Sequence, residues 1–249
     1  MEYTFYGDLL GISGYYKLSP GTAREKLNQF YNTAFFSLSD YCRDNDTVQV
    51  MMFSDSLLLF GEDTLAALGE LHKVYVKLIQ KSLLLRGAIV KGRLSFEPRF
   101  TLDNYTKMLP ENDMLARAVG LQSTKKGARL LIENQLAEEL LANYPEWLTH
   151  EGYIRYVEDN NYAVPYESIL RRICPTPDQD TYECLYFWTY NGDLEHQELD
   201  YREVQEELSQ INSMLKDSIS IHYRETIGLL KRCQNRQRFT MERMLSNRS

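Results

Sequence analysis

The sequence has few of the features that mark a secreted, membrane-spanning or zinc-binding protein. Its cysteines lie far apart, without the pairwise spacing of a zinc site: Cys42, Cys174, Cys184 and Cys233. No apolar run is long enough to cross a bilayer, and the N-terminal stretch lacks the basic start and apolar core of a secretory signal. No internal repeat or low-complexity tract is present. We therefore expect a cytoplasmic protein with reduced thiols and no membrane contact.

Positive charge is also scarce. The chain carries 28 Lys and Arg residues against 35 Asp and Glu residues, which gives a formal net charge of −7. A general nucleic-acid binder needs a basic face, so we expect no nucleic-acid partner. A polyanionic nucleotide can still bind where basic groups converge locally.

What the sequence does contain is enough apolar material for a core. Hydrophobic residues make up 43% of 249 residues, which excludes wholesale disorder and fits one large domain, alone or with an appendage. We expect a domain over residues 1–198 and a long helical appendage over residues 199–249. Apolar residues from Val204 to Leu230 recur there at intervals of three or four, and we expect this stripe to pack on the domain or on a twin chain.

The pattern of the first 140 residues predicts an α+β fold, with an antiparallel sheet and helices on one face. We expect strands over residues 2–8 and 183–190 and within 83–96 and 128–133, a hairpin over 48–61, and helices over about 63–83, 112–122 and 133–142. A further helix begins near Ser19 and Pro20, which are suited to an N-cap and a first turn. Thr22 and Glu25 offer an alternative capping box.

Two aspartates each follow an apolar run that is typical of a strand. Asp8 follows EYTFYG, and Asp55 follows VQVMMFS. Neither neighbourhood favours a charge unless a cation neutralises it. Two such carboxylates side by side would repel each other unless one took up a proton or a divalent metal lay between them. Oxygen ligands suit Mg²⁺ or Mn²⁺, which commonly bind phosphates, so the pair favours a metal-dependent nucleotide enzyme.

Each aspartate also has an ordinary structural interpretation. Asp8 would cap a turn or the next helix, and Asp55, between two serines, would be a hairpin-turn residue. The four histidines have no catalytic neighbours in sequence, and we interpret them as surface or interface residues.

Four segments occur in an order that resembles the class III nucleotidyl cyclases. They are DLLGISG (8–14), FSDSLLLF (53–60), LRGAIVKG (85–92) and NDMLARAVGLQSTKKGARLLI (112–132). The resemblance covers about residues 3–140. It is greatest to the bacterial pyrimidine cyclases of Pycsar anti-phage systems, which implies a ferredoxin-like cyclase domain.

The resemblance implies a head-to-tail homodimer with active sites at the interface, and it assigns residues to them. Asp8 and Asp55 would bind two Mn²⁺ or Mg²⁺ ions, together with the backbone carbonyl of Leu9. Arg129 matches an arginine that contacts the nucleotide phosphates. Met51 stands where purine cyclases carry a base-selecting lysine, which favours a pyrimidine or another base.

The chain also departs from the family pattern. The asparagine and arginine that stabilise the transition state in purine enzymes are replaced by Ala116 and Gly120, and Arg117 falls three residues from the arginine position. The basic residues that could substitute are Arg86, Lys91, Arg93, Lys125 and Lys126.

The resemblance therefore implies a cyclase that converts UTP to cyclic UMP and pyrophosphate, with CTP and cyclic CMP as the alternative. It would make a signal in anti-phage defence, and a separate effector would respond to the product rather than to direct contact. Two other interpretations stay open. One is a weak or inactive cyclase-like nucleotide sensor, and the other is an interaction protein that assembles a complex through its C-terminal helix.

Overall fold

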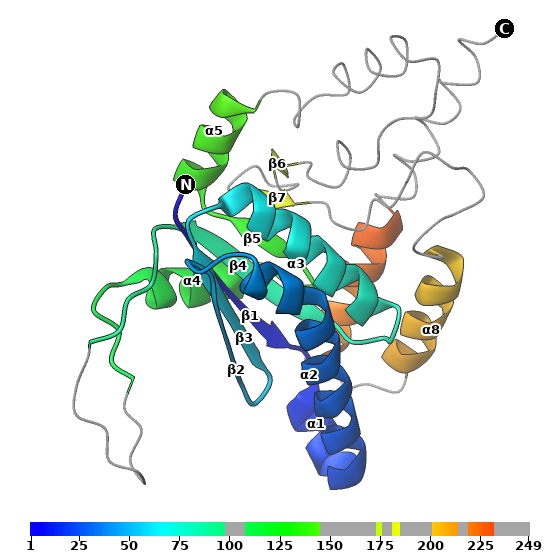
Figure 1. Cartoon of the computed structure of the whole chain (residues 1–249). Coiled ribbons are helices and arrows are strands. Elements are labelled where there is room, and N and C mark those ends of the chain that lie inside the picture. Colours follow the sequence, from blue (N-terminus) through cyan, green and yellow to red (C-terminus); the bar gives the residue numbers. More distant parts are fainter. Residues whose placement is uncertain (98–107, 145–172, 176–180, 185–200, 214–218, 232–249) are drawn as a thin grey trace, which may run out of the picture.

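The computed structural model describes residues 1–97, 108–144, 173–175, 181–184, 201–213 and 219–231. Its centre is a sheet of strand order β2-β3-β1-β4-β5-β7-β6 (Figure 1). The strands are β1 (Tyr3–Leu9), β2 (Gln49–Phe53), β3 (Ser56–Gly61), β4 (Leu85–Lys91), β5 (Leu130–Ile132), β6 (Ile173–Pro175) and β7 (Tyr182–Cys184). The predicted α+β fold class is confirmed.

One strand pair departs from the expected antiparallel sheet. β1 lies between β3 and β4 and is antiparallel to both, but β4 and β5 are parallel. Parallel neighbours need a crossover connection, and the segment between them contains α4 (Met114–Ser123).

Local signals set where the helices begin. α1 (Ile12–Leu18) is followed by α2 (Pro20–Arg43), where the Ser19 side chain accepts a bond from the Thr22 N–H at 3.4 Å. Of the two predicted starts, the one at Ser19 and Pro20 is therefore the one formed. α3 (Thr64–Ile79) is capped by Asp63, and α5 (Asn134–Asn143) follows β5.

The two faces of the sheet are covered differently. Alternate residues of β1 and β3 (Tyr3, Phe5, Leu57 and Leu59) are buried in the main core with apolar residues of α2 and α3, which lie in front of the sheet in Figure 1. The opposite face carries a smaller cluster of Leu58, Phe60 and Leu94, against which Met114 of α4 packs. The expectation that the helices share one face is wrong for α4.

The described residues of the C-terminal part form two helical segments, α8 (Tyr201–Ser213) and residues 219–231 (Figure 1). The Ser220 hydroxyl donates to the Asn212 side chain at 2.8 Å. In one continuous helix these residues would be about 12 Å apart along the axis, beyond the reach of two short side chains. The expected single long helix is therefore wrong.

Both C-terminal segments contribute to the main core. Val204 and Leu208 of α8, and Tyr223, Leu229 and Leu230 of the second segment, are buried in the cluster formed by α2, α3 and the sheet. The packing on the domain agrees with the apolar stripe. The proposed boundary at residue 199 stays a prediction.

The expected strand over 183–190 lies outside the described residues beyond Cys184. None of the helices within the described ranges is long and apolar enough to cross a membrane.

Candidate active site

Asp8 belongs to a row of residues that crosses four strands. Its Cα pairs with Ser56 of β3 and with Arg86 of β4, and Ser56 pairs with Phe53 of β2. Residues directly opposite each other share a face of a sheet. Phe53, Ser56, Asp8 and Arg86, called here the carboxylate row, therefore lie on the face opposite α2 and α3.

Asp55 lies one residue beyond this row, in the two-residue turn between β2 and β3. Ser54 in that turn has φ of 53°, a left-handed conformation typical of tight hairpins. The Leu9 N–H donates to the Asp55 carbonyl oxygen at 2.8 Å, which fastens the end of β1 to the turn. In an antiparallel pair one residue points its N–H and C=O to the same neighbour, so the Leu9 carbonyl also faces the turn.

The structure thus sets the Asp55 turn against the end of β1, where Asp8 and Leu9 lie, through a backbone bond. Within the described parts of the chain, no three His, Cys, Asp or Glu side chains form a metal-ligand cluster. The expected site needs only two carboxylates and a backbone carbonyl, and such hard oxygen donors fit Mg²⁺ or Mn²⁺. Metal binding by Asp8, Leu9 and Asp55 stays a prediction.

Two glycines next to the carboxylate row make room for the Phe5 ring between β1 and β4. Gly7 and Gly87 are paired across β1 and β4. A Cβ on Gly87 would lie 2.4 Å from the Phe5 ring and 2.6 Å from the Tyr75 hydroxyl, and one on Gly7 would lie 2.8 Å from the same ring. The Phe5 ring thus occupies the space that side chains at these two positions would fill. Gly7 precedes Asp8 in sequence, and Gly87 follows Arg86.

Arg86 holds both oxygens of Asp8. Its Nε lies 3.3 Å from Oδ1, and its Nη2 lies 3.0 Å from Oδ2. The Arg86 and Asp8 side chains are 15% and 25% exposed, so the pair is partly open to solvent. Among the basic residues considered from the sequence, Arg86 is the one that the structure pairs with a proposed metal ligand.

The helical segment 219–231 contacts the loop that precedes β5. The Gly127 N–H donates to His222 Nδ1 at 3.2 Å, and the Ala128 N–H donates to the Thr226 hydroxyl at 2.9 Å. Burial lowers the pKa of His222, the charges of Arg86 and Lys126 lower it further, and Asp8 acts in the opposite direction. His222 is therefore half-buried beside the proposed site. The interpretation of the histidines as surface or interface residues is wrong for His72, which is buried in α3.

Arg129 is committed to contacts inside the fold. Its side chain is 8% exposed; Nη1 pairs with Glu183, Nη2 pairs with Glu225 at 3.2 Å, and Nε donates to the Lys126 carbonyl at 2.8 Å. These contacts join β5 to β7 and to the segment 219–231. Its role at the nucleotide phosphates stays a prediction, which the observed pairing does not favour.

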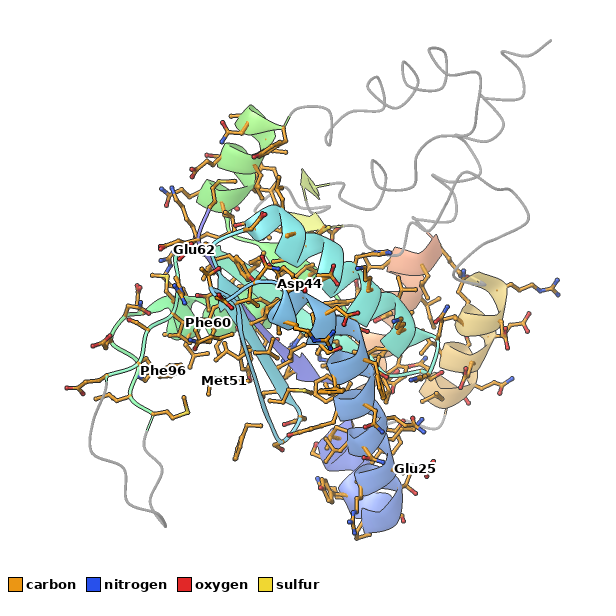
Figure 2. All side chains as sticks on the ribbon, in the orientation of Figure 1. Glu25, Asp44, Met51, Phe60, Glu62 and Phe96 are labelled. Atoms are coloured by element: carbon orange, nitrogen blue, oxygen red, sulfur yellow. The ribbon has the colours of Figure 1, made fainter. Side chains whose placement is uncertain are left out.

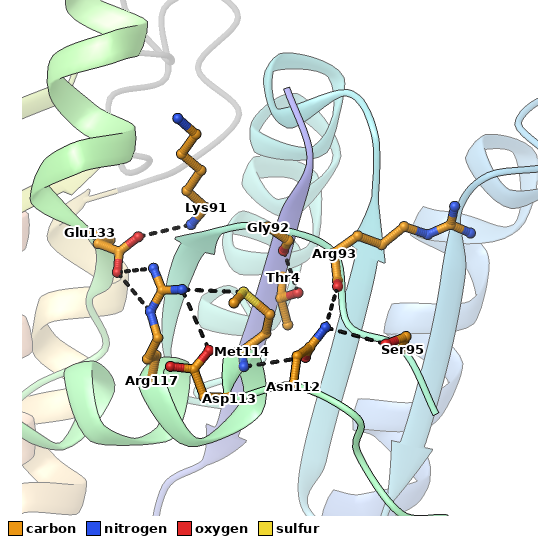
Figure 3. A network of polar contacts seen from close by, with 10 residues as sticks. All are labelled: Thr4, Lys91, Gly92, Arg93, Ser95, Asn112, Asp113, Met114, Arg117 and Glu133. Carbon is orange, nitrogen blue, oxygen red and sulfur yellow. Dashed lines mark hydrogen bonds and ion pairs between the residues drawn. The ribbon is translucent and has the colours of Figure 1, made fainter. Parts of the chain in front are cut away.

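Other basic residues near the sheet are also paired with carboxylates. Figure 3 shows Arg117 bonded to Glu133, with Asp113 at 3.8 Å. Lys91 pairs with Glu139 at 2.6 Å, and Arg93 pairs with Glu62 at 3.1 Å.

The two positions that depart from the family pattern are open. Ala116 and Gly120 are exposed on α4, and a Cβ on Gly120 would meet nothing within 4 Å. Residues four apart lie on the same face of a helix. Larger side chains would therefore fit at both positions.

Met51 lies in the row next to Asp8, on the same face. Its Cα pairs with Leu58, which in turn pairs with Tyr6 of β1. Its side chain packs against the cluster of Leu58, Phe60 and Leu94, and Figure 2 shows Met51 near Phe60. Met51 thus fills a gap between apolar residues, and its contact with a base stays a prediction.

An open hollow of about 620 Å³ lies beside the hairpin turn, between α2 and Ser54. Arg24, Asn28 and Tyr31 of α2 line it. Its volume is in the range of small-molecule sites.

Comparison with known proteins finds no matching family model and no matching curated protein. Among solved structures, the chain is similar to the adenylyl cyclase CyaB from P. aeruginosa, with 17% identity and a TM-score of 0.47 over 57% of this chain and 81% of that one. It is also similar to the dimeric guanylyl cyclase domain of the RhoGC fusion protein from Blastocladiella emersonii, with 14% identity and a TM-score of 0.46 over 57% and 83%.

A third similar structure is the guanylate cyclase domain of RhGC from Catenaria anguillulae in complex with GTP. It has 14% identity and a TM-score of 0.43 over 56% of this chain and 81% of that one. Because all three TM-scores are below 0.5, these similarities by themselves assign neither a family nor an activity to this chain.

Proposed function

We propose that this protein is a metal-dependent nucleotide cyclase that converts UTP to cyclic UMP and pyrophosphate. The observation that supports the proposal is the 2.8 Å bond from the Leu9 N–H to the Asp55 carbonyl oxygen, which sets the turn that carries Asp55 next to the strand end that carries Asp8. Their sequence segments are the ones that resemble class III cyclases.

In the proposed reaction, the ribose 3′-hydroxyl attacks the α-phosphate and pyrophosphate leaves. When bound, two Mn²⁺ or Mg²⁺ ions would lower the pKa of the hydroxyl and offset the charge of the triphosphate. Asp8 and Asp55 would hold these ions between neighbouring strand ends. Arg86, and Lys126 in the loop before β5, are the cations whose charges act on His222 beside Asp8, and they would stabilise charge on the phosphates.

The pyrimidine preference rests on Met51. An apolar thioether cannot supply the charged donor with which purine cyclases select a base at this position. UTP is our first choice, and CTP giving cyclic CMP is the alternative. Within this proposal the product is a signal in anti-phage defence that a separate effector reads inside the cell.

We also propose a homodimer that uses the face carrying the carboxylate row. Phe53 in this row is 83% exposed, and Met108 and Leu109, in the segment that leads to α4, are 48% and 43% exposed. Exposed apolar side chains on the face with the proposed ligands support an interface there.

The direct test incubates the pure full-length chain with each of the four nucleoside triphosphates and Mn²⁺. Mass spectrometry of the products should show a cyclic pyrimidine nucleotide and pyrophosphate, and Asp55→Ala should abolish both. Asp40→Ala is the matched control, because Asp40 forms a surface ion pair with Arg43 and is 80% exposed. Product formation that survives Asp55→Ala would refute the mechanism.

The sensor alternative is favoured by one specific observation, the small side chains at the open positions 116 and 120. If missing transition-state groups limit turnover, the double variant Ala116→Asn with Gly120→Arg should raise the rate, because one such donor is commonly worth about 10²–10³-fold. The sensor interpretation predicts nucleotide binding without product in both proteins, measured by calorimetry and mass spectrometry. The scaffold interpretation is less favoured, because both described helical segments after residue 200 have apolar residues buried in the main core.

A further inference from the structure

The Asp8 carboxylate already has a cationic partner. Arg86 stands directly opposite it on β4 and contacts one carboxylate oxygen with Nε and the other with Nη2, at 3.3 and 3.0 Å. This two-pronged geometry is the strongest form of arginine–carboxylate pairing. The Asp8 oxygens expected to bind metal are therefore the atoms that Arg86 holds.

Metal and guanidinium compete for these oxygens. A carboxylate whose two oxygens accept from one arginine cannot offer them to a divalent ion in the same geometry. An ion at this place would also repel the adjacent guanidinium, and the repulsion is stronger where the site is shielded from water. Arg86 is 15% exposed, so leaving it unpaired is unfavourable.

A triphosphate would resolve this conflict. The fork of an arginine side chain fits a phosphate as well as it fits a carboxylate. The guanidinium of Arg86 lies against the Asp8 carboxylate at the end of β1. A phosphate bound by the metal at Asp8 would lie within reach of the same guanidinium.

We propose that Arg86 is a positioning residue that occupies Asp8 in the resting protein and transfers to the nucleotide phosphates when metal and nucleotide arrive together. The inference rests on the proposed function. It makes binding cooperative: metal alone must displace Arg86 without providing a new partner, whereas metal with a triphosphate provides one. Free metal then binds weakly, and nucleotide strengthens its binding.

The test measures Mn²⁺ binding to the full-length protein by electron paramagnetic resonance, with and without a non-cyclisable UTP analogue that lacks the 3′-hydroxyl. In the wild type, the analogue should tighten Mn²⁺ binding about tenfold or more, in the usual range of coupling between sites. Arg86→Met should bind Mn²⁺ alone about tenfold more tightly than the wild type, and the strengthening by the analogue should shrink. The control Arg93→Met removes an arginine from the Glu62 pair and should leave both values unchanged.

A second measurement does not depend on the folding of a variant. In the wild type labelled with ¹⁵N-arginine, the Arg86 Nε–H resonance should shift when Mg²⁺ and the analogue are added together, and only slightly with Mg²⁺ alone. The resonance that is missing from the spectrum of Arg86→Met is assigned to Arg86, and circular dichroism checks that this variant is folded. Arg86→Lys provides a milder variant for the Mn²⁺ titration.

The outcomes separate the two proposals. If Arg86→Met binds Mn²⁺ no more tightly while the wild type makes cyclic nucleotide, the transfer of Arg86 is refuted and the cyclase stands. If no form of the protein binds Mn²⁺ with or without nucleotide, both are refuted. In a third outcome, Arg86→Met binds metal more tightly and with reduced cooperativity, but the wild type makes no product. This outcome supports the exchange at Asp8 and refutes the cyclase.

Discussion

Two arginine–carboxylate pairs occupy neighbouring parts of the same sheet and differ in their surroundings. Arg129 and Glu183 are 8% and 2% exposed, and Arg129 makes two further contacts, with Glu225 and with the Lys126 carbonyl. Arg86 and Asp8 are 15% and 25% exposed and lie beside the Asp55 turn. The comparison distinguishes an arginine that holds strands together from one whose partner can be exchanged.

The largest expected effect is on the buried pair. Arg129→Ala should lower the free energy of unfolding by about 3–5 kcal/mol, because it removes the arginine that pairs with the buried Glu183 carboxylate. Urea denaturation followed by circular dichroism measures this loss. The control Arg43→Ala, in a surface pair that is 73% and 80% exposed, should change stability by less than about 1 kcal/mol. An Arg129→Ala protein of unchanged stability that loses activity would instead support the phosphate role.

The next largest loss of stability is expected where β1 and β4 pack closely, next to the Arg86–Asp8 pair. Gly87→Ala places a methyl group 2.4 Å from the Phe5 ring, and overpacking of this kind typically costs about 1–3 kcal/mol. Its control is Gly120→Ala, which meets nothing within 4 Å on an exposed helix face and should stabilise the protein by up to about 1 kcal/mol. Equal effects of the two changes in urea denaturation would argue against the close packing of β1 and β4.

Arg86→Met should affect stability less than Arg129→Ala does. The Asp8 carboxylate that it leaves behind is 25% exposed and can be hydrated, so we expect a loss below about 2 kcal/mol. Differential scanning calorimetry of the two variants side by side gives the ranking. A larger loss for Arg86→Met would mean that its pair is the structural one.

The smallest effect is a pH dependence at His222. Burial, reinforced by Arg86 and Lys126, lowers the pKa of this group below its ordinary value of 6.5 in the folded protein. The unfolded chain therefore binds the proton more readily, and stability should be full above pH 6.5 and fall as the pH drops from there towards the folded pKa. His222→Asn keeps an acceptor for the Gly127 N–H but does not titrate, so its stability should fall less over the same range. Identical pH profiles would contradict this assignment.

The sequence predicted those features that depend on neighbours along the chain. The turn at Asp55 followed from two apolar runs separated by two residues, and the start of α2 followed from Ser19 and Pro20. The places of β1 and β4 were also foreseeable, because each is a mainly apolar segment that contains a glycine.

Features that depend on distant segments were missed. The partner of Asp8 is 78 residues away, and the partners of Arg129 are 54 and 96 residues away. Register across strands decides these pairings, and no local pattern encodes it. The apolar stripe after residue 200 predicted a buried helix face, but the contact between Asn212 and Ser220 has no signal in that periodicity.

The most direct test of the account is Mn²⁺-dependent turnover of the four nucleoside triphosphates by the wild type, Asp8→Asn and Asp55→Asn, with Asp40→Asn as the control. We predict a cyclic pyrimidine nucleotide and pyrophosphate from the wild type and from Asp40→Asn, and neither product from the other two. Undiminished product from Asp8→Asn or Asp55→Asn would show that these two aspartates do not hold the metal ions and the reacting nucleotide.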